Sequence, residues 1–185
     1  MKVKSEFQWR IDHMKLNRIM RKNRKEGKKL YYVFLDFDGV LNVFFEPGTP
    51  EFEAMRKKIE DGGEFEFADR KCVERLNAFC EAFPVRLIIS SSWRFSGIDY
   101  CQEYLEKAGL KKEHRFFGMT NTEEFHPREE DIVSYLFSHP DFTGFIVFDD
   151  MDMPHLKEYH VQTDPSKGWN EEKNAEAYII MQNFC

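Results

Sequence analysis

The sequence predicts an α/β protein built on a doubly wound parallel sheet. Short, almost continuously apolar segments alternate with amphipathic segments along most of the chain. Strands that are apolar at nearly every position are typical of parallel sheets, because helices cover both of their faces. Carboxylates directly follow two of the apolar segments, at the positions where the ligand sites of such sheets lie.

The composition is that of one folded domain without a membrane contact. The chain has 185 residues, of which 42% are hydrophobic and 16% aromatic, enough for a sizeable core. No apolar run approaches the roughly 20 residues that span a bilayer, and the basic N-terminus lacks the apolar block of a signal peptide. The four cysteines show neither CxxC spacing nor a dense framework. These features predict a cytoplasmic protein in a reducing compartment.

The N-terminal segment differs in charge from the rest of the chain. Residues 1–29 contain eleven Lys or Arg and three acidic residues, a net charge of +8. Because the whole chain carries −6, the other 156 residues carry −14. Phe7, Ile11 and Met14 recur at helical spacing. We therefore expect a basic helical arm over 1–29, followed by an acidic domain over 30–185.

Five apolar segments are expected to form the strands of the sheet. They are Leu30–Leu35, Val85–Ile89, Arg115–Phe117, Gly144–Phe148 and Tyr159–Gln162. Four segments with apolar residues at helical spacing are expected to form the covering helices. They are Ala68–Phe83, Ile98–Ala108, Arg128–Ser138 and Asn170–Asn183.

Residues 43–67 interrupt this alternation. They contain Pro47, Pro50 and the pair Gly62-Gly63, which are typical of irregular chain. A segment of this length is too short for a core of its own. We therefore expect a small lid insertion here rather than a folded cap domain.

Polar side chains follow three of the expected strands. Because the carboxyl ends of parallel strands meet at one edge of the sheet, these side chains are expected to converge. They are Asp36 and Asp38 after the first strand, Ser90-Ser91-Ser92-Trp93-Arg94 after the second, and Asp149-Asp150 after the fourth.

Asp36 and Asp38 stand two residues apart, on the same face of an extended strand. Two like charges held side by side cost free energy unless a cation neutralises them or one carries a proton. Clustered carboxylates without His or Cys ligands suit Mg²⁺, which takes oxygen ligands and keeps some waters. The plain alternative is a strand-end turn in which Gly39 supplies the bend. The second acidic pair, behind another strand, favours the metal site.

Several of these motifs resemble a known superfamily. LDFDGVLN at 35–42 resembles the DxD signature that forms the first motif of haloacid dehalogenase (HAD) phosphatases. Ile88-Ile89-Ser90 is similar to the second motif, an apolar strand ending in Ser or Thr, and Phe148-Asp149-Asp150 is similar to the acidic fourth motif. Arg128 stands where the third motif more usually has Lys. The segments SSSWR, GMTNT, REEDIVSYL, FDDMD and HVQTDPSKGW together resemble the HAD phosphatase domains of modular RNA-repair proteins.

The resemblance implies a HAD-like Rossmannoid fold with a minimal cap, and it implies roles for single residues. Asp36 would be the nucleophile and a metal ligand. Asp38 would be the general acid and base, with its backbone carbonyl on the metal. Asp150 would bind the metal directly, supported by Asp149. The remaining candidates are Ser90 and Arg128 for catalysis and Ser91, Arg94 and Gly39 for substrate contacts, with Mg²⁺ as the cofactor.

Plainer roles are open for some of these residues. Ser91 and Ser92 are equally suited to cap the following turn. Arg94 is equally suited to pair with a structural carboxylate. Trp93 is expected to pack, and Asp152 is expected to be a solvated or structural acid.

The implied activity is that of an Mg²⁺-dependent phosphomonoesterase working through an aspartyl-phosphate. Its substrate would be a phosphorylated small molecule, a nucleotide or a nucleic-acid end. Two alternatives stand beside it: a phosphotransferase, and a nucleic-acid binding protein whose HAD body is vestigial. The basic arm is expected either to contact nucleic acid or to dock on the domain, and the expected docking residues are Phe7, Trp9, Ile11 and Met14.

Overall fold

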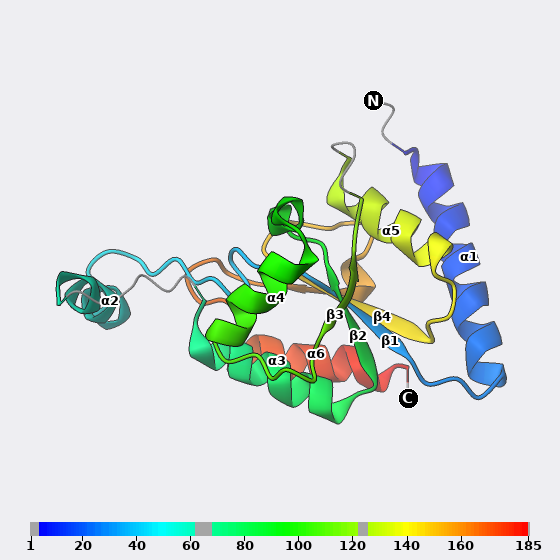
Figure 1. Cartoon of the computed structure of the whole chain (residues 1–185). Helices are drawn as coiled ribbons and strands as arrows, with labels where there is room; N and C mark the ends of the chain where they lie inside the picture. The colour runs from blue at the N-terminus through cyan, green and yellow to red at the C-terminus, as the bar shows by residue number, and fades with distance from the viewer. Residues whose placement is uncertain (1–3, 62–67, 122–125, 185) are drawn as a thin grey trace.

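The computed structural model of the chain describes residues 4–61, 68–121 and 126–184, and they form an α/β fold around one parallel sheet (Figure 1). All five strands of the sheet run parallel, in the order β3-β2-β1-β4-β5. The expected fold class is therefore confirmed. The strands are β1 (Tyr31–Leu35), β2 (Val85–Ile89), β3 (Phe116–Met119), β4 (Gly144–Asp149) and β5 (His160–Gln162).

Helices lie on both sides of the sheet. Figure 1 shows α3 and α6 side by side below it, while α5 covers the opposite face and α1 lies beside α5. Phe79 of α3 and Tyr178 of α6 meet edge to face, with ring centroids 5.7 Å apart. The bounds are α1 (Glu6–Lys25), α3 (Arg70–Ala82), α4 (Ile98–Lys107), α5 (Arg128–Ser138) and α6 (Glu171–Gln182).

The central strands are buried along their whole length. Every residue of β1 and of β4 is buried, as expected for strands covered on both faces. Large aromatic side chains fill the space beneath them: Phe148 of β4 stacks on Trp169 with ring centroids 3.9 Å apart, and Phe79 meets both rings edge on. The strands whose ends carry the candidate site are therefore held by tight aromatic packing.

The excursion at 43–67 contains a helix that the sequence pattern did not predict. Helix α2 (Pro50–Glu60) is capped by Thr49, whose hydroxyl accepts from the amide of Phe52. Pro50 is the first residue of the helix, a position that proline favours. It buries no residue, and it projects from the body of the molecule (Figure 1). Residues 62–67 lie outside the described part, and a lid function for the segment stays a prediction.

Helix α1 is docked on the domain, but by only some of the residues expected. Trp9, Leu16 and Met20 are buried, whereas Phe7 and Met14 are 72% and 65% exposed. The expected docking role of Phe7 and Met14 is therefore wrong, and that of Trp9 is right. The buried stripe also contains Asp12 and Asn23. These polar side chains can be buried because they have hydrogen-bond partners there. A search for apolar residues at helical spacing does not find such positions.

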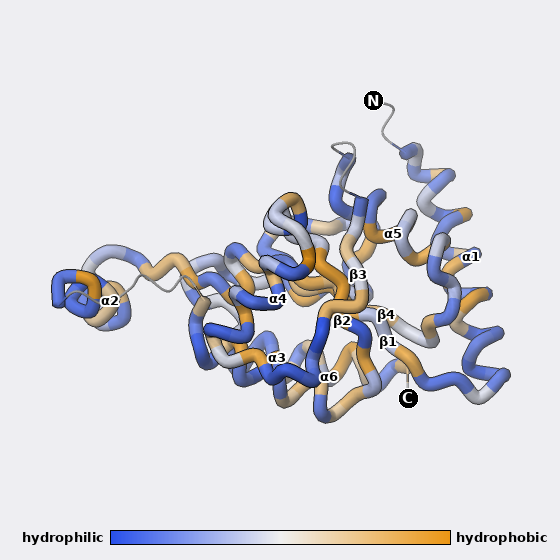
Figure 2. The backbone as a smooth tube through the Cα atoms, viewed as in Figure 1, coloured by the Kyte–Doolittle hydropathy of each residue, from blue (hydrophilic) through white to orange (hydrophobic). Residues whose placement is uncertain are grey.

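The amide of Asn23 shows how this docking is made. Its Nδ2 donates to the backbone carbonyls of Pro140 and Phe142 at 2.8 and 2.7 Å, in the segment that joins α5 to β4. Figure 2 shows α1 as mostly hydrophilic, with hydrophobic residues interspersed along it. Among the helices described, none is long and apolar enough to cross a membrane.

Candidate functional site

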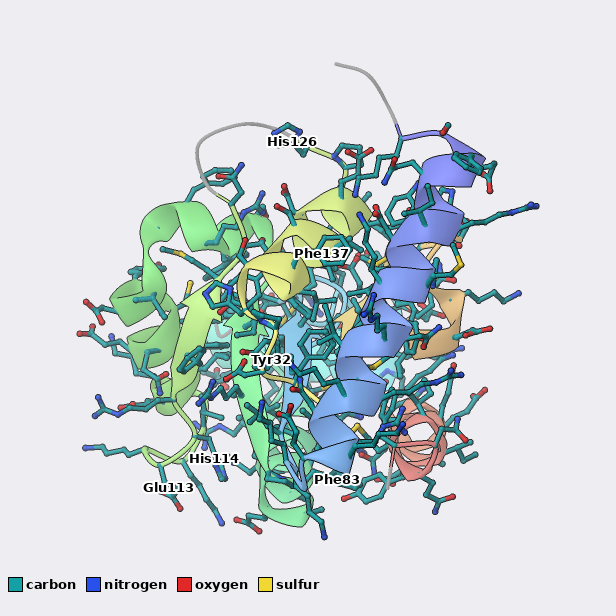
Figure 3. All side chains as sticks on the ribbon, turned by 90° about the vertical axis from the view of Figure 1, so that its right-hand side faces the viewer. Tyr32, Phe83, Glu113, His114, His126 and Phe137 are labelled. Atoms are coloured by element: carbon teal, nitrogen blue, oxygen red, sulfur yellow. The ribbon has the colours of Figure 1, made fainter. Side chains whose placement is uncertain are left out.

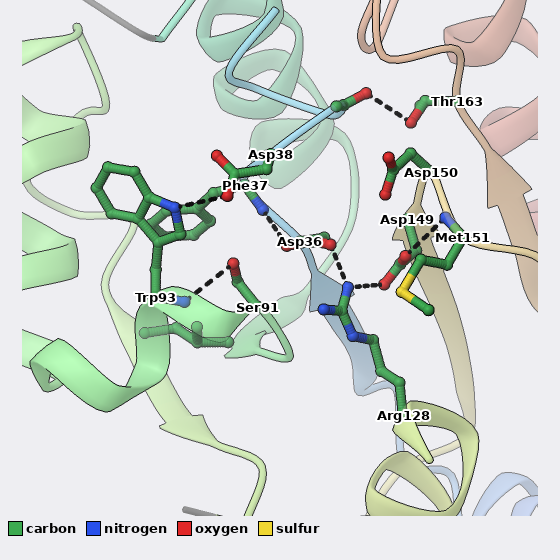
Figure 4. Close-up of polar contacts among 12 residues, drawn as sticks. Asp36, Phe37, Asp38, Ser91, Trp93, Arg128, Asp149, Asp150, Met151 and Thr163 are labelled. Carbon is green, nitrogen blue, oxygen red and sulfur yellow. Dashed lines mark hydrogen bonds and ion pairs between the residues drawn. The ribbon is translucent and has the colours of Figure 1, made fainter. Parts of the chain in front are cut away.

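Three carboxylates meet at the carboxyl edge of the sheet. Strands β1 and β4 are neighbours, with Leu35 opposite Phe148, so the residues that follow them come together. One carboxylate oxygen from each of Asp36, Asp149 and Asp150 lies within 4.8 Å of the others (Figure 4). Asp36 and Asp149 are buried and Asp150 is half-buried.

Arg128, the first residue of α5, reaches into this cluster. Its Nη1 donates to Oδ2 of Asp36 and, at 2.6 Å, to Oδ2 of Asp149 (Figure 4). Burial lowers the pKa of Arg128, but the attraction of the two carboxylates outweighs burial and leaves the pKa above its ordinary value. A cation at a helix N-terminus is opposed by the helix dipole. Here the two acids offset that cost.

The two acids of the cluster that follow β4 have raised pKa values. Burial and the nearby charge of Asp36 raise the pKa of Asp149 to about 7, although Arg128 acts in the opposite direction. Burial and Asp36 also raise the pKa of Asp150. A raised carboxyl pKa means that further positive charge would be favourable at this place.

Mg²⁺ fits this donor set. The three converging ligand atoms are all carboxylate oxygens, which are hard ligands of the kind that Mg²⁺ binds. Asp38 contributes no carboxylate oxygen to the group. Its part in metal binding, expected through the backbone carbonyl, stays a prediction.

Gly39 gives the turn after β1 the shape that Asp150 requires. Its φ of +72° lies in the left-handed region, and a Cβ at this position would lie 2.8 Å from the side chain of Asp150. Its carbonyl accepts from the hydroxyl of Thr163 at 2.7 Å, which ties the turn to the end of β5. The observed role of Gly39 is thus to let the two loops approach, and its substrate contact stays a prediction.

Asp38 is turned away from the cluster and held by the protein. Its Oδ2 accepts from the indole Nε1 of Trp93 at 3.0 Å (Figure 4). Its Oδ1 accepts from Nδ2 of Asn42 at 2.7 Å. The hydroxyl of Tyr104 donates to Oδ1 of Asn42 at 2.7 Å, which fixes which way the amide faces. The rings of Trp93 and Tyr104 also pack together, with centroids 4.5 Å apart.

Sequence reasoning did not assign this polar role to Trp93 or Asn42. Trp93 was expected only to pack, and Asn42 lies inside LDFDGVLN without an assigned role. Two features of the sequence could have indicated these hydrogen bonds to Asp38. Asn42 stands four residues after Asp38, and Trp93 lies in the loop after β2, the strand next to β1.

The serines after β2 have different surroundings. Ser90 is fully buried, and its hydroxyl has no hydrogen-bond partner within the described residues. The hydroxyl of Ser91 accepts from the amide of Trp93 and caps the short helix η1 (Ser92–Ser96). Of the two roles left open for Ser91, capping is the one observed. Ser90 keeps an unused donor, and its amide donates to the carbonyl of Leu35, the residue before Asp36.

Arg94 is buried and holds the loop in place. Its Nε donates to the carbonyl of Asn121 at 2.8 Å, and its Nη1 donates to that of Ser91 at 2.9 Å. Its Nη2 lies 3.6 Å from the carboxylate of Asp131. The pairing with a structural carboxylate is therefore observed, and substrate binding by Arg94 stays a prediction. Asp152 is exposed, as expected.

A family model matches residues 32–174, and its description is "HAD domain in Swiss Army Knife RNA repair proteins". The range contains every candidate site residue and ends inside α6. Helix α1 lies outside it. No curated protein and no solved structure matches the chain.

Proposed function

The chain belongs to the HAD domain family of the Swiss Army Knife RNA repair proteins, and from this premise we propose that it is an Mg²⁺-dependent phosphomonoesterase working through an aspartyl-phosphate. Membership of the family supports phosphatase-type chemistry. The observation that carries the finer proposal is the cluster of Asp36, Asp149 and Asp150, in which Asp36 and Asp149 accept from the guanidinium of Arg128.

Asp36 would act as the nucleophile. Its Oδ2 accepts from Arg128 and its Oδ1 accepts from the amide of Phe37 at 2.7 Å, so the carboxylate is held in one orientation. In the first step an oxygen of Asp36 forms a bond to phosphorus, and the ester bond to the leaving oxygen breaks. Asp38 gives that oxygen a proton. In the second step Asp38 takes a proton from a water molecule whose oxygen bonds to phosphorus. The bond between phosphorus and the Asp36 oxygen breaks, so phosphate leaves and the carboxylate is restored.

Other residues of the site would bind the phosphoryl group. The unused hydroxyl of Ser90 can donate to a phosphoryl oxygen. Arg128 balances negative charge beside the nucleophile. Mg²⁺ held by Asp36, Asp149 and Asp150 would offset the repulsion between these acids and the anionic substrate.

We propose the phosphorylated end of a nucleic acid as the substrate class. The family description names RNA repair, and the described part of the excursion at 43–67 contains the projecting helix α2, which buries no residue. Such a segment leaves room for an extended substrate. Assays of 3′- and 5′-phosphorylated oligoribonucleotides, set against a mononucleotide, would rank these substrates directly.

The reaction is tested with an aryl phosphate. We expect hydrolysis in Mg²⁺, loss of activity in chelator, and loss of turnover in Asp36→Asn, because an amide keeps the shape of the carboxylate but is a poor nucleophile. Asp152→Asn is the matched control: the same chemical change at an exposed acid should leave activity intact. Circular dichroism checks that both variants fold. Full activity in a folded Asp36→Asn variant would falsify the mechanism.

A further inference from the structure

Helix α1 presents an exposed face on which cations predominate. Arg10, Arg18, Arg21 and Lys25 are all exposed, and within the described residues none of them pairs with a carboxylate. They follow one another at spacings of eight, three and four residues, which places them along one side of the helix. Figure 3 views the molecule from the side on which α1 lies, with α5 next to it.

The acidic residues of α1 and its C-cap do not neutralise these cations. Asp12 is buried and accepts from Lys4 and Gln8. Glu6 pairs with His155, 3.2 Å away. Glu26 pairs with Lys28 and Lys22 at 3.0 and 3.8 Å, so Lys22 alone on this face has an acidic neighbour. Glu26 therefore offsets one cation of this face, whereas Arg10, Arg18, Arg21 and Lys25 form no ion pair within the described residues.

Two exposed apolar side chains lie among the cations. Phe7 and Met14 continue the same stripe, at 72% and 65% exposure. Met14, Arg18, Arg21 and Lys25 line a hollow of about 680 Å³, and Asn17, Lys22 and the acidic residue Glu26 complete its lining. Cations that alternate with exposed apolar side chains are typical of surfaces on which nucleic-acid strands lie, with phosphates on the cations and bases on the apolar groups.

The N-terminal half of α1 is fixed to the edge of the sheet that carries the site. The ring of Trp9 stacks on that of His155, with centroids 4.3 Å apart and planes 7° from parallel. His155 in turn binds Glu129 at 2.9 Å, and Glu129 is the neighbour of Arg128. The amide of Lys4 donates to Glu130 at 3.2 Å. The exposed stripe is thus held rigidly, starting beside the candidate site.

We propose that the outer face of α1 binds the sugar-phosphate backbone of a nucleic-acid strand. Guanidinium groups match phosphate oxygens in two-point hydrogen bonding. Because 156 residues of the chain carry −14, a strand would otherwise be repelled. That this strand is the one whose end enters the site rests on the proposed function.

An anionic membrane fits this face less well. An interfacial helix needs a free apolar face to enter the lipid. The apolar stripe of α1, Trp9, Leu16 and Met20, is already buried against the domain. Its outer face offers only Phe7 and Met14.

The test is a binding measurement on the full chain that does not depend on turnover. A fluorescent single-stranded RNA without a terminal phosphate is titrated with the protein across a salt series. The test variant is the triple change Arg18→Gln, Arg21→Gln and Lys25→Gln. The matched control removes three exposed cations elsewhere, by Lys107→Gln, Lys112→Gln and Arg115→Gln.

The test variant should bind the RNA about 100-fold more weakly than the control at low salt, because it lacks three cations that would each neutralise a phosphate. Each such contact with a single strand contributes about 0.7 to the slope of the logarithm of the binding constant against the logarithm of the salt concentration. The slope for the test variant should fall by about 2, and its hydrolysis of the aryl phosphate should equal that of the control. Equal RNA binding by the two variants overturns the proposal. So does tighter binding of the unchanged protein to polyglutamate or to anionic vesicles than to RNA. If neither protein hydrolyses the aryl phosphate but the test variant still binds RNA more weakly than the control, the proposed phosphatase function is wrong. The proposal that α1 binds RNA is then still supported.

Discussion

Asp38 has both of its carboxylate oxygens engaged by side chains of the protein. Trp93 and Asn42 supply the two donors, and Tyr104 orients Asn42. A residue that carries a proton must point at the leaving oxygen at the right moment. These donors set the orientation from which Asp38 starts, so we interpret them as positioning residues.

The change Trp93→Phe should separate two kinds of substrate. It keeps an aromatic ring against Tyr104 but removes the N–H donor. We expect turnover of an alkyl phosphate to fall about tenfold, within the range that general acid catalysis contributes. An aryl phosphate should be affected much less, because its leaving group needs little protonation. Steady-state kinetics on both substrates checks this, and an equal loss on both would show that Trp93 has only a packing role.

At this scale the sequence predicted which side chains converge, but not how each one is oriented. The positions of Asp36 and Asp149 follow from parallel topology alone, since both stand at carboxyl ends of strands. The orientation of Asp38 depends on Tyr104, which lies 62 residues from Asn42 in sequence. No local pattern encodes such a contact.

Among the elements, the two helices outside the expected sheet-and-helix alternation differ most from expectation. Helix α2 was missed because it buries no face, although Thr49 and Pro50 carry the signal of a helix start. Helix α1 was expected, but its packing face was misassigned. In α1 both the exposed and the buried apolar residues recur at helical spacing. The pattern alone therefore does not show which of them pack on the domain.

The docking of α1 predicts a difference between two aromatic residues on the same helix. Trp9→Ala should lower the free energy of unfolding by about 3 kcal/mol, since a buried ring is lost. Phe7→Ala, at a residue 72% exposed, should change it by less than about 0.5 kcal/mol. Urea unfolding measures both. Equal effects would mean that α1 is not held by its Trp9 face in solution.

For the whole molecule, we expect the candidate metal site to make the stability of the fold depend on Mg²⁺. A ligand that binds only the folded chain stabilises it by about 2.7 kcal/mol at 100 times its Kd. For a chain of this size the Tm should rise by roughly 5 to 10 °C. Thermal scans with Mg²⁺ and with chelator measure this without any substrate.

The same scans distinguish the two acids after β4. Asp150→Ala should weaken the Mg²⁺ effect on Tm more than Asp149→Ala does. The oxygens of Asp149 already accept from Arg128 and from the amide of Met151, whereas Asp150 is the neighbour that the family resemblance assigns to direct metal contact. Equal or reversed shifts would exchange the two roles.

The docking of α1 also bears on the order in which the chain is made. Its Asn23 binds the carbonyls of Pro140 and Phe142, which lie 117 and 119 residues further along the chain. At ribosomal rates of about 5 to 20 residues per second, roughly 6 to 24 s pass before these acceptors exist. During that interval the stripe of Trp9, Leu16 and Met20 has no surface to cover it, and the nascent helix is open to chaperones. Helix α1 must therefore close onto the domain late in folding, after α5 and β4 have been synthesised.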